Sequence, residues 1–431
     1  MLSKVLSAAL IGIDAVTVQV EVDIAQGLPQ FSTVGLPDGA VKESKDRVKA
    51  ALKNSGYEFP ARRITVNLAP ADLKKEGTSF DLPIAVGILA ATGVVRKDRL
   101  AEYLVIGELS LDGSIKGVRG SLPVAVTAKA EKRKGIIVPI ENVNEAGIVE
   151  GVDIFGVSDL AEVVGFLNGE VAVVPHQVDI HQLFRLEAEY HEDFSEVRGQ
   201  ENAKRALEVA AAGAHNLLML GPPGSGKTML ARRLPTILPQ MSFPEAIETT
   251  KIYSIMGLLD RERALIAQRP FRSPHHTISD VGLIGGGNTP KPGEVSLAHN
   301  GVLFLDELPE FKKHVLEVLR QPLEDGRVTI SRALASITYP ARVMLVSALN
   351  PCPCGYLGDP THSCSCSPRD IHRYRSRISG PLMDRIDIHI EVPAVKYRDL
   401  ADRTDSESSA LIAARVESSR KLQLERFKGM K

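Results

Sequence analysis

A glycine-rich segment carries the clearest chemical signature in the chain. Between the apolar run 217–220 and the amphipathic run 229–234 lie Gly221, Pro222, Pro223, Gly224, Ser225, Gly226, Lys227 and Thr228. Glycines let backbone N–H groups surround phosphate oxygens, and a helix that begins here adds positive potential. In such a P-loop the lysine contacts the β- and γ-phosphates, and the adjacent hydroxyl binds Mg²⁺. The segment therefore predicts a nucleoside triphosphate site, and a chance glycine-rich turn is the alternative.

Two adjacent acids follow further along the chain. Asp306 and Glu307 come directly after residues 301–305, whose apolar pattern is typical of a buried strand in a parallel sheet. After a P-loop, the first acid holds Mg²⁺ and the second orients the attacking water. We therefore expect Asp306 to bind the metal and Glu307 to act in catalysis, whereas a solvated strand end is the alternative for the pair.

Four cysteines lie together in the sequence rather than scattered through it. They form two Cys-x-Cys pairs separated by nine residues: Cys352, Cys354, Cys364 and Cys366. Four thiolates can close a tetrahedral Zn²⁺ site, so we expect a structural zinc, with free thiols in a loop as the alternative. His275 and His276 lack an evident third ligand, and we do not expect them to bind a metal.

The elements that must position these residues indicate an α/β protein. Alternating or periodic apolar residues predict strands near 16–22, 64–68, 104–111 and 136–138, and helices near 40–55, 81–91, 123–134 and 158–167. This order predicts a mixed α/β N-terminal domain that ends near Gly169. The strands predicted at 217–220, 301–305 and 343–346 would place the P-loop and the acids in a second, parallel α/β domain.

The same pattern predicts the domain boundaries. We expect an N-terminal domain at 1–169, a linker at 170–192, a nucleotide-binding domain at 193–393 and a partial helical lid at 394–431. The linker contains His176, His181 and His191, whose spacing is not that of metal ligands, so it is interpreted as a solvated connection.

Composition excludes several classes of protein. The 431 residues carry a formal net charge of -1, so any contact with nucleic acid must be local rather than driven by the whole-molecule field. No run approaches the ~18 apolar residues of a membrane span, and the N-terminus lacks a secretory pattern. Clustered cysteines also suit a reducing compartment, and we expect a cytosolic protein.

The N-terminal part resembles the Lon-protease-like domain that also occurs in some recombination ATPases. The resemblance is carried by residues 75–83, Lys-Glu-Gly-Thr-Ser-Phe-Asp-Leu-Pro, and by residues 106–113, Ile-Gly-Glu-Leu-Ser-Leu-Asp-Gly. It places Ser79 at the position of the proteolytic serine. A Ser–Lys protease also needs a lysine that accepts the serine proton, and Lys116 lies a few residues too early. We therefore expect a domain without peptidase activity.

The nucleotide-binding part resembles the AAA+ class. Residues 193–200, Asp-Phe-Ser-Glu-Val-Arg-Gly-Gln, match the segment that lines the adenine pocket, which favours ATP over GTP. The resemblance implies that Asn350 is the sensor 1 residue beside the γ-phosphate. It also implies that Arg385, within a segment similar to that of magnesium-chelatase-type subunits, is an arginine finger for a neighbouring site. A surface ion pair with Asp384 or Asp387 is the alternative for Arg385.

Taken in order, these segments resemble the ComM/YifB family of bacterial magnesium-chelatase-like AAA+ proteins. The resemblance implies a hexameric, ATP- and Mg²⁺-dependent DNA motor, a helicase that promotes branch migration in homologous recombination and the integration of transforming DNA. Two other functions stay open. The chain could be the ATPase subunit of a magnesium-chelatase-like metal insertion complex, or a nucleotide-binding DNA-interaction module without motor activity.

Two insertions carry the expectation of DNA binding. Residues 270–288 form a turn-rich stretch that looks like the helix-two insertion of AAA+ helicases, and residues 327–339 are interpreted as a β-hairpin that projects into the pore of related rings. A ring repeats each basic side chain around its pore, so near-neutral subunits can bind phosphates. Arg272 and Arg332 are the candidate contacts, and ordinary surface arginines are the alternative.

A further amphipathic helix is predicted at 407–426. Its apolar residues would be Leu411, Ile412, Val416, Leu422 and Leu424. In the family the lid continues beyond this point and carries another ATP-sensing arginine. We therefore expect a truncated family member that binds ATP, with turnover and ring stability reduced by the missing part of the lid.

Overall fold

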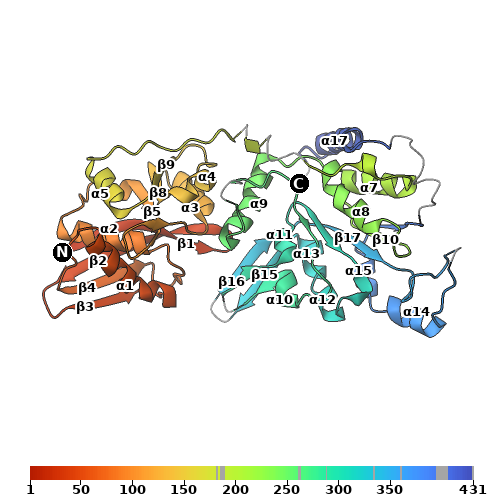
Figure 1. Cartoon of the computed structure of the whole chain (residues 1–431), viewed down its shortest axis with the longest axis horizontal. Coiled ribbons are helices and arrows are strands. Elements are labelled where there is room, and N and C mark those ends of the chain that lie inside the picture. Colours follow the sequence, from red (N-terminus) through yellow and green to blue (C-terminus); the bar gives the residue numbers. More distant parts are fainter. Residues whose placement is uncertain are drawn as a thin grey trace. The chain divides into compact units, whose positions relative to one another are not determined.

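The computed structural model describes residues 1–180, 183–184, 190–260, 264–287, 289–332, 335–359, 362–394 and 406–429. The chain divides into two compact units, Met1–Phe184 with Thr250–Leu265, and Arg185–Thr249 with Ile266–Lys431. The elements of each unit are labelled in Figure 1. His181 of the expected linker and Asn288 of the first expected insertion lie outside the described residues, as do residues 395–405 and 430–431 of the expected lid.

The first unit is built on a mixed seven-stranded sheet with strand order β3-β4-β2-β1-β5-β8-β9. Its strands are β1 (Leu2–Ile11), β2 (Asp14–Ala25), β3 (Gln30–Val34), β4 (Arg63–Ala69), β5 (Tyr103–Val105), β8 (Gly135–Pro139) and β9 (Asp153–Val157), with a separate hairpin of β6 (Glu108–Leu109) and β7 (Ile115–Lys116). Its helices are α1 (Gly39–Asn54), α2 (Asp81–Thr92), α3 (Ser121–Ala130), α4 (Val143–Ala146) and α5 (Leu160–Asn168). The mixed α/β prediction for this part is confirmed.

Strand β1 shows why three strands of this sheet, β1, β3 and β9, were not expected. Its inward positions include Ser3 and Ser7 as well as Val5, so the sequence lacks a clear alternation of polar and apolar residues. The Ser3 hydroxyl is satisfied inside by donating to the carbonyl oxygen of Gly87 at 2.6 Å. The pattern of β2 is simpler, because Val18, Val20 and Val22 are all fully buried on one face.

Residues at the start of the expected linker contact the first unit. The backbone N–H of His176 donates to the carbonyl oxygen of Ile154 at 2.8 Å, and its ring Nε2 lies 2.9 Å from Asn144 Oδ1. Residues around 176 therefore lie against β9 instead of forming a fully solvated connection.

The second unit contains the P-loop and the predicted catalytic residues. Its strands are β10 (Leu217–Leu220), β11 (Phe271–Arg272), β12 (Gly285–Gly286), β13 (Lys291–Pro292), β14 (Val302–Leu305), β15 (Arg327–Arg332), β16 (Ala335–Pro340), β17 (Met344–Leu349) and β18 (Ile388–Glu391). Its α-helices are α7 (Glu201–Gly213), α8 (Lys227–Arg233), α9 (Phe243–Met256), α10 (Asp280–Ile284), α11 (Glu294–Leu297), α12 (Lys313–Glu317), α13 (Arg320–Asp325), α14 (Pro368–Arg375), α15 (Gly380–Met383) and α17 (Ser409–Arg426). Helix α9 ends in residues that belong to the first unit.

A parallel five-stranded sheet, β11-β14-β17-β10-β18, forms the centre of the second unit. Val302 and Phe304 pack into the apolar core formed with α7, α8 and α17, whereas Leu303 and Leu305 are buried on the other face. Figure 1 shows α7 and α17 on one side of this sheet and α12 and α13 on the other. This three-layer α/β/α arrangement confirms the predicted fold class. Because the strands are parallel, the segments after β10, β14 and β17 meet at one edge.

Helix α17 corrects the expected amphipathic face. Ile412 and Val416 are buried against α7, but Leu411, Leu422 and Leu424 are between 59% and 66% exposed. The buried pair is one helical turn apart, which is a narrower stripe than the predicted set of five residues requires.

Within the described residues, no helix combines the length and apolar character needed to cross a membrane.

Candidate active site

The P-loop connects β10 to α8. Gly224 and Gly226 have φ angles of 74° and 91°, in the left-handed region that other residues rarely adopt. Gly221 is constrained by space instead, because a Cβ atom there would lie 2.1 Å from the carbonyl oxygen of Val392. The glycines therefore allow a tight backbone loop of the kind that can approach phosphate oxygens.

Lys227 folds back over this loop. Its Nζ donates to the carbonyl oxygens of Gly221 at 2.7 Å and Pro222 at 2.9 Å, and to Asn350 Oδ1 at 3.2 Å. Burial lowers the pKa of the Lys227 ammonium group, while the negative charge of Asp306 acts in the opposite direction. The ammonium group rests on neutral oxygen acceptors, which the oxygens of a bound phosphate can replace.

Thr228 and Asp306 lie in direct contact. The Thr228 hydroxyl donates to Asp306 Oδ2 at 2.8 Å, and Asp306 Oδ1 accepts the backbone N–H of Glu307 at 2.9 Å. Hydroxyl and carboxylate oxygens are ligands that Mg²⁺ accepts, and the ion usually keeps waters and phosphate oxygens as its other ligands. The pair therefore fits a nucleotide-bound Mg²⁺ at the start of α8.

Glu307 directly follows Asp306 and has a left-handed backbone with φ of 53°. Its side chain is 54% exposed, and its Oε2 lies 3.5 Å from Nδ1 of His276. His276 follows β11 and packs against the ring of His275 at a centroid distance of 4.1 Å. The carboxylate is therefore open to solvent, as a residue that orients water must be, and it contacts a ring from the neighbouring strand's loop.

Asn350 follows β17 and is fixed from several directions. Its side-chain oxygen accepts from Lys227, and its backbone N–H lies beside the phenol of the buried Tyr374 and lowers the pKa of that phenol. Burial raises the pKa of Tyr374 to about 12, so the phenol is neutral at physiological pH. The preceding residue, Leu349, accepts a hydrogen bond from the N–H of Gly221 at 3.2 Å. The structure thus brings Asn350, Lys227 and the P-loop together.

The segment predicted to line the adenine pocket packs against the P-loop. Asp193 caps a short 3-10 helix (Phe194–Glu196) by accepting the N–H of Ser195 at 2.7 Å. Gln200 donates from Nε2 to the carbonyl oxygens of Ser225 at 3.2 Å and Pro393 at 2.7 Å. Gln200 therefore ties this segment to the loop that would hold the phosphates.

Arg385 lies just after α15, and its guanidinium contacts residues of the same chain. It pairs with Glu324, and its Nη1 donates to the carbonyl oxygen of Pro381 at 2.5 Å. Asp387, one of the alternative partners, instead accepts the backbone N–H of Asn216 at 2.8 Å. An arginine finger role would require Arg385 to exchange Glu324 for the phosphates of a neighbour.

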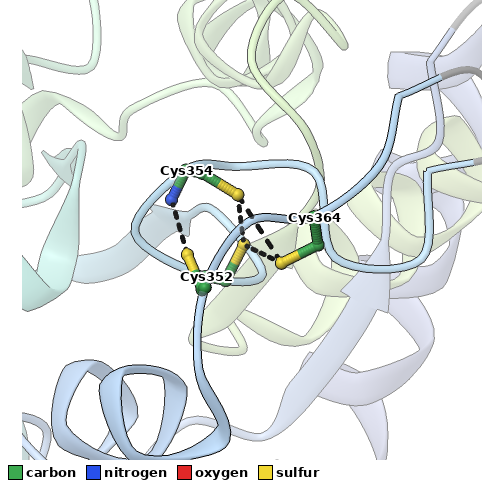
Figure 2. Close-up of side chains that lie close together, drawn as sticks. Cys352, Cys354 and Cys364 are labelled. Atoms are coloured by element: carbon green, nitrogen blue, oxygen red, sulfur yellow. Dashed lines mark hydrogen bonds between the residues drawn. The ribbon is translucent and has the colours of Figure 1, made fainter.

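The four cysteines converge into one cluster, defined here as Cys352, Cys354, Cys364 and Cys366. Figure 2 shows the sulfur atoms of the first three directed toward one another, with Sγ separations of 3.3 Å, 3.6 Å and 3.7 Å. All four sulfur atoms lie within 4.8 Å of one another. Four thiolates around zinc at about 2.3 Å would be separated by roughly 3.8 Å. The cluster therefore has nearly the dimensions of a tetrahedral Zn²⁺ site.

The predicted β-hairpin is formed by β15 and β16, with Arg332 opposite Ala335 next to the turn. Val328, Ile330 and Tyr339 are buried, and the Tyr339 hydroxyl donates to the carbonyl oxygen of Pro290 at 2.7 Å. Arg332 is exposed at the far end of the same hairpin. The buried residues anchor the base and leave Arg332 available to a ligand.

Arg272 is placed differently from what we expected. It lies in β11, which pairs in parallel with β14 in the central sheet, and not in a turn-rich insertion. Its Nε and Nη2 donate to the two carboxylate oxygens of Glu294 at 2.6 Å and 2.7 Å. This bidentate pair satisfies the edge of the guanidinium that a phosphate would use, so Arg272 is the weaker of the two candidate DNA contacts.

The serine of the Lon-like segment lies just before α2. Ser79 accepts the N–H of Gly107 through its backbone oxygen at 3.1 Å, and Lys116 is exposed on β7. Lys75 is fully buried, its Nζ donates to the carbonyl oxygen of Pro70, and burial lowers its pKa. In the described part of the chain, no hydrogen bond joins a lysine to the Ser79 hydroxyl. The absence of peptidase activity stays a prediction.

Two residues that touch the site were not predicted from the sequence. His276 was expected only not to bind a metal, and Tyr374 was assigned no role. Each reaches its partner, Glu307 or Asn350, across elements that are distant in the sequence. The polar pattern alone did not identify these contacts, although the proximity of His276 to the end of a strand was a usable signal.

Comparisons with known proteins match both units. A family model described as "Magnesium chelatase, subunit ChlI" matches residues 193–400, and one described as "Subunit ChlI of Mg-chelatase" matches residues 20–142. The competence protein ComM of Haemophilus influenzae is 48% identical over 430 residues, which cover 99% of this chain and 83% of that protein. The uncharacterized protein YifB of Escherichia coli is 46% identical over 428 residues, with the same coverage of 99% and 83%. Lon protease 2 of Bacillus subtilis is 32% identical over 157 residues, which cover 33% of this chain and 27% of that protein.

Proposed function

Because this chain belongs to the ComM/YifB family of magnesium-chelatase-like AAA+ proteins, we propose that it is an ATP-driven DNA motor. In this proposal it is a cytosolic helicase that promotes branch migration during homologous recombination. The family implies ATP hydrolysis with Mg²⁺. The observation that carries the proposal is the contact of Thr228 with Asp306 beside Lys227 and Asn350, which supports an assembled ATPase site. The name of the Haemophilus relative supports a role in the processing of incoming DNA.

The chemical roles follow from the geometry of the site. Lys227 and the P-loop backbone would bind the phosphates, and Thr228 and Asp306 would hold Mg²⁺. Mg²⁺, when bound, neutralises charge that develops on the β- and γ-phosphate oxygens. The exposed carboxylate of Glu307 would orient the attacking water, and Asn350 would position it. Each of these residues lies at the same edge of the parallel sheet.

Assembly and DNA binding are part of the same proposal. A homo-hexamer would bring Arg385 of one subunit to the ATP of the next, after Arg385 leaves Glu324. The ring would present Arg332 of each hairpin to DNA phosphates, which is compatible with a subunit charge of -1. The cysteine cluster would bind one structural Zn²⁺, which its sulfur separations support.

A branch-migration assay tests the proposed function. Purified full chain is incubated with ATP, Mg²⁺ and a synthetic four-way junction, and the resolved strands are measured beside ATP hydrolysis. We expect junction-stimulated hydrolysis and strand exchange, and loss of both in Glu307→Gln by at least about 100-fold, because a general base is removed. ATP hydrolysis without any response to branched DNA would reject the motor function.

The match to the magnesium chelatase family model favours one competing function, an ATPase that drives metal insertion. That function predicts ATP-dependent stimulation of porphyrin metalation by the remaining chelatase subunits and no effect of branched DNA. A nucleotide-binding DNA module without motor activity would bind DNA but would show no ATP hydrolysis that depends on Glu307. The branch-migration assay and the porphyrin-metalation assay together separate the three functions.

A further inference from the structure

We propose that zinc bound by the cysteine cluster holds Asn350 in its catalytic position. Loss of zinc would then lower the rate of ATP hydrolysis strongly and change the affinity for ATP only slightly. This inference rests on the proposed ATPase function and concerns the control of the same site.

The first cysteine pair is joined to the active site through a single intervening residue, Pro351. Cys352 is fully buried and lies two residues after Asn350. The turn after it is closed by the Gly355 N–H, which donates to the Cys352 carbonyl oxygen at 3.0 Å. A Cβ atom on Gly355 would lie 2.6 Å from Cδ of Pro223, so this turn packs directly against the P-loop. The turn that follows the first pair thus packs against the P-loop.

The second pair reaches the same residue through α14. Cys366 directly precedes Ser367, whose hydroxyl caps α14 by accepting the N–H of Asp370 at 3.2 Å. At the other end of the helix, Arg375 donates to the carbonyl oxygen of Pro351 at 3.3 Å and 3.1 Å, and the phenol of the buried Tyr374 lies beside the backbone N–H of Asn350.

Both ends of the cysteine segment therefore converge on residues 350 and 351. The Cys354 N–H donates to Cys366 Sγ at 3.3 Å, which links the two pairs directly.

The physical effect of zinc follows from this arrangement. Four thiolates at these distances repel one another unless a cation or protons neutralise them, so the metal holds the start of α14 against the end of β17. Loss of the metal frees α14, so that Arg375 no longer holds the Pro351 carbonyl and Tyr374 no longer packs beside the Asn350 backbone. Catalysis depends on such preorganisation, because a misplaced polar group no longer stabilises the transition state. The ligands that bind the phosphates, Lys227 and the P-loop backbone, are not supplied by the cluster.

A double substitution in the second pair tests the effect of the metal. Cys364→Ser with Cys366→Ser is compared with wild type and with Ser365→Ala, a matched control between the same two cysteines. Zinc content, the dissociation constant of a fluorescent ATP analogue and the rate of hydrolysis are measured on full-length chain. We expect the double variant to lose zinc and about tenfold in kcat, with ATP affinity changed less than about twofold. A zinc-free wild type, or a zinc-free variant with unchanged kcat, would overturn the proposal.

Tyr374→Phe tests the connection while all four cysteines remain. We expect this variant to keep wild-type zinc content and to lose several-fold in kcat, because the polar group that α14 places beside the Asn350 backbone N–H is removed. Unchanged turnover in Tyr374→Phe would show that α14 does not position Asn350.

Amide hydrogen exchange of residues 349–351 gives a readout that needs no turnover. Zinc should slow exchange at Asn350 in wild type, and this protection should be lost in Tyr374→Phe. If wild type binds zinc and shows this protection but hydrolyses no ATP, the proposed ATPase function fails while the positioning by zinc stands. Identical exchange with and without zinc would refute the positioning itself.

Discussion

At the scale of single residues, the contact between His276 and Glu307 affects the rate of ATP hydrolysis when DNA is absent. The Glu307 carboxylate is exposed and lies 3.5 Å from the His276 ring. His276 belongs to the loop after β11, which continues into α10 and then into β12 and β13 beside the hairpin. A change at the hairpin could therefore reach the carboxylate through one continuous segment of chain.

We expect His276→Ala to raise the DNA-free rate of ATP hydrolysis by about two- to fivefold. The contact is partly exposed and therefore weak, and its removal frees the Glu307 carboxylate to reach the attacking water. Stimulation by DNA, measured as the ratio of rates with and without DNA, should shrink accordingly. His275→Ala is the control for loss of a neighbouring histidine, since His275 packs against His276 and contacts Thr277 but makes no ion pair with Glu307. A lower DNA-free rate in His276→Ala would mean that the ring assists Glu307.

The chemical roles of the P-loop residues were the part of the site that the sequence predicted best. The glycines, Lys227 and Thr228 act within one short loop, so their spacing contains most of the information. Arg272 was harder to interpret, because a strand of two residues is defined only by its pairing with β14. Tyr374 reaches Asn350 from a helix that begins after the cysteine cluster, and no local pattern encodes that contact.

At the scale of elements, α17 is held to α7 by charge as well as by apolar packing. Arg415 donates to the Glu208 carboxylate at 2.6 Å and 3.2 Å, and these hydrogen bonds lower the pKa of Glu208 from its usual value of 4.5. A carboxylate whose pKa is lowered in the folded protein contributes its full stabilisation at pH values above its pKa in the unfolded protein. That contribution is lost as pH falls through the lower pKa of the folded form.

Arg415→Met should therefore lower the Tm by roughly 2 °C at pH 7.5, an effect typical of a partly exposed ion pair. The difference from wild type should begin to shrink as pH falls below about 4.5, where Glu208 of the unfolded chain becomes protonated, and should disappear only below the lowered pKa of folded Glu208. Thermal unfolding followed by circular dichroism across this pH range measures the effect. Lys421→Met, an exposed change on the same helix, should show no such pH dependence.

The hairpin of β15 and β16 gives a second prediction at this scale. Arg332→Ala should weaken DNA binding by about three- to tenfold at low salt and reduce the slope of log K against log salt by about one per subunit, because one phosphate contact is lost. Fluorescence anisotropy at several salt concentrations measures both quantities. Arg327→Ala, at the base of the same hairpin, serves as the control. Equal effects of the two substitutions would remove Arg332 from the proposed DNA site.

Most elements were predictable, but their buried faces were less so. The alternation of valines identified β2, whereas inward serines concealed β1. In α17 the periodicity indicated a helix correctly but could not say which apolar residues the rest of the unit covers, and Leu411, Leu422 and Leu424 are exposed. Burial depends on partners far away in the sequence, and a local pattern does not contain them.

At the scale of the whole molecule, the proposed ring predicts that two inactive variants can restore one another. Lys227→Ala disables the ATP site of its own subunit, and Arg385→Ala disables the finger that would act on a neighbour. In a mixed ring, some interfaces combine an intact P-loop with an intact finger, so the mixture should hydrolyse ATP faster than either variant alone. Titration of one variant into the other, followed by ATPase assay, measures this recovery. A mixture with no activity above the sum of its parts would argue against a finger in trans.

The strand order of the second unit also constrains how the protein is made. Strand β10 lies between β17 and β18, both of which are encoded much later in the chain. During synthesis β10 leaves the ribosome with both of its edges unpaired, and it stays so until its neighbours have been translated. Nascent chains that end before β17 therefore expose the apolar strand β10 with the P-loop that follows it. Such chains should bind chaperones more strongly than chains that extend past β18. The position that makes β10 the centre of the ATP site also makes it the last strand to be protected on both sides.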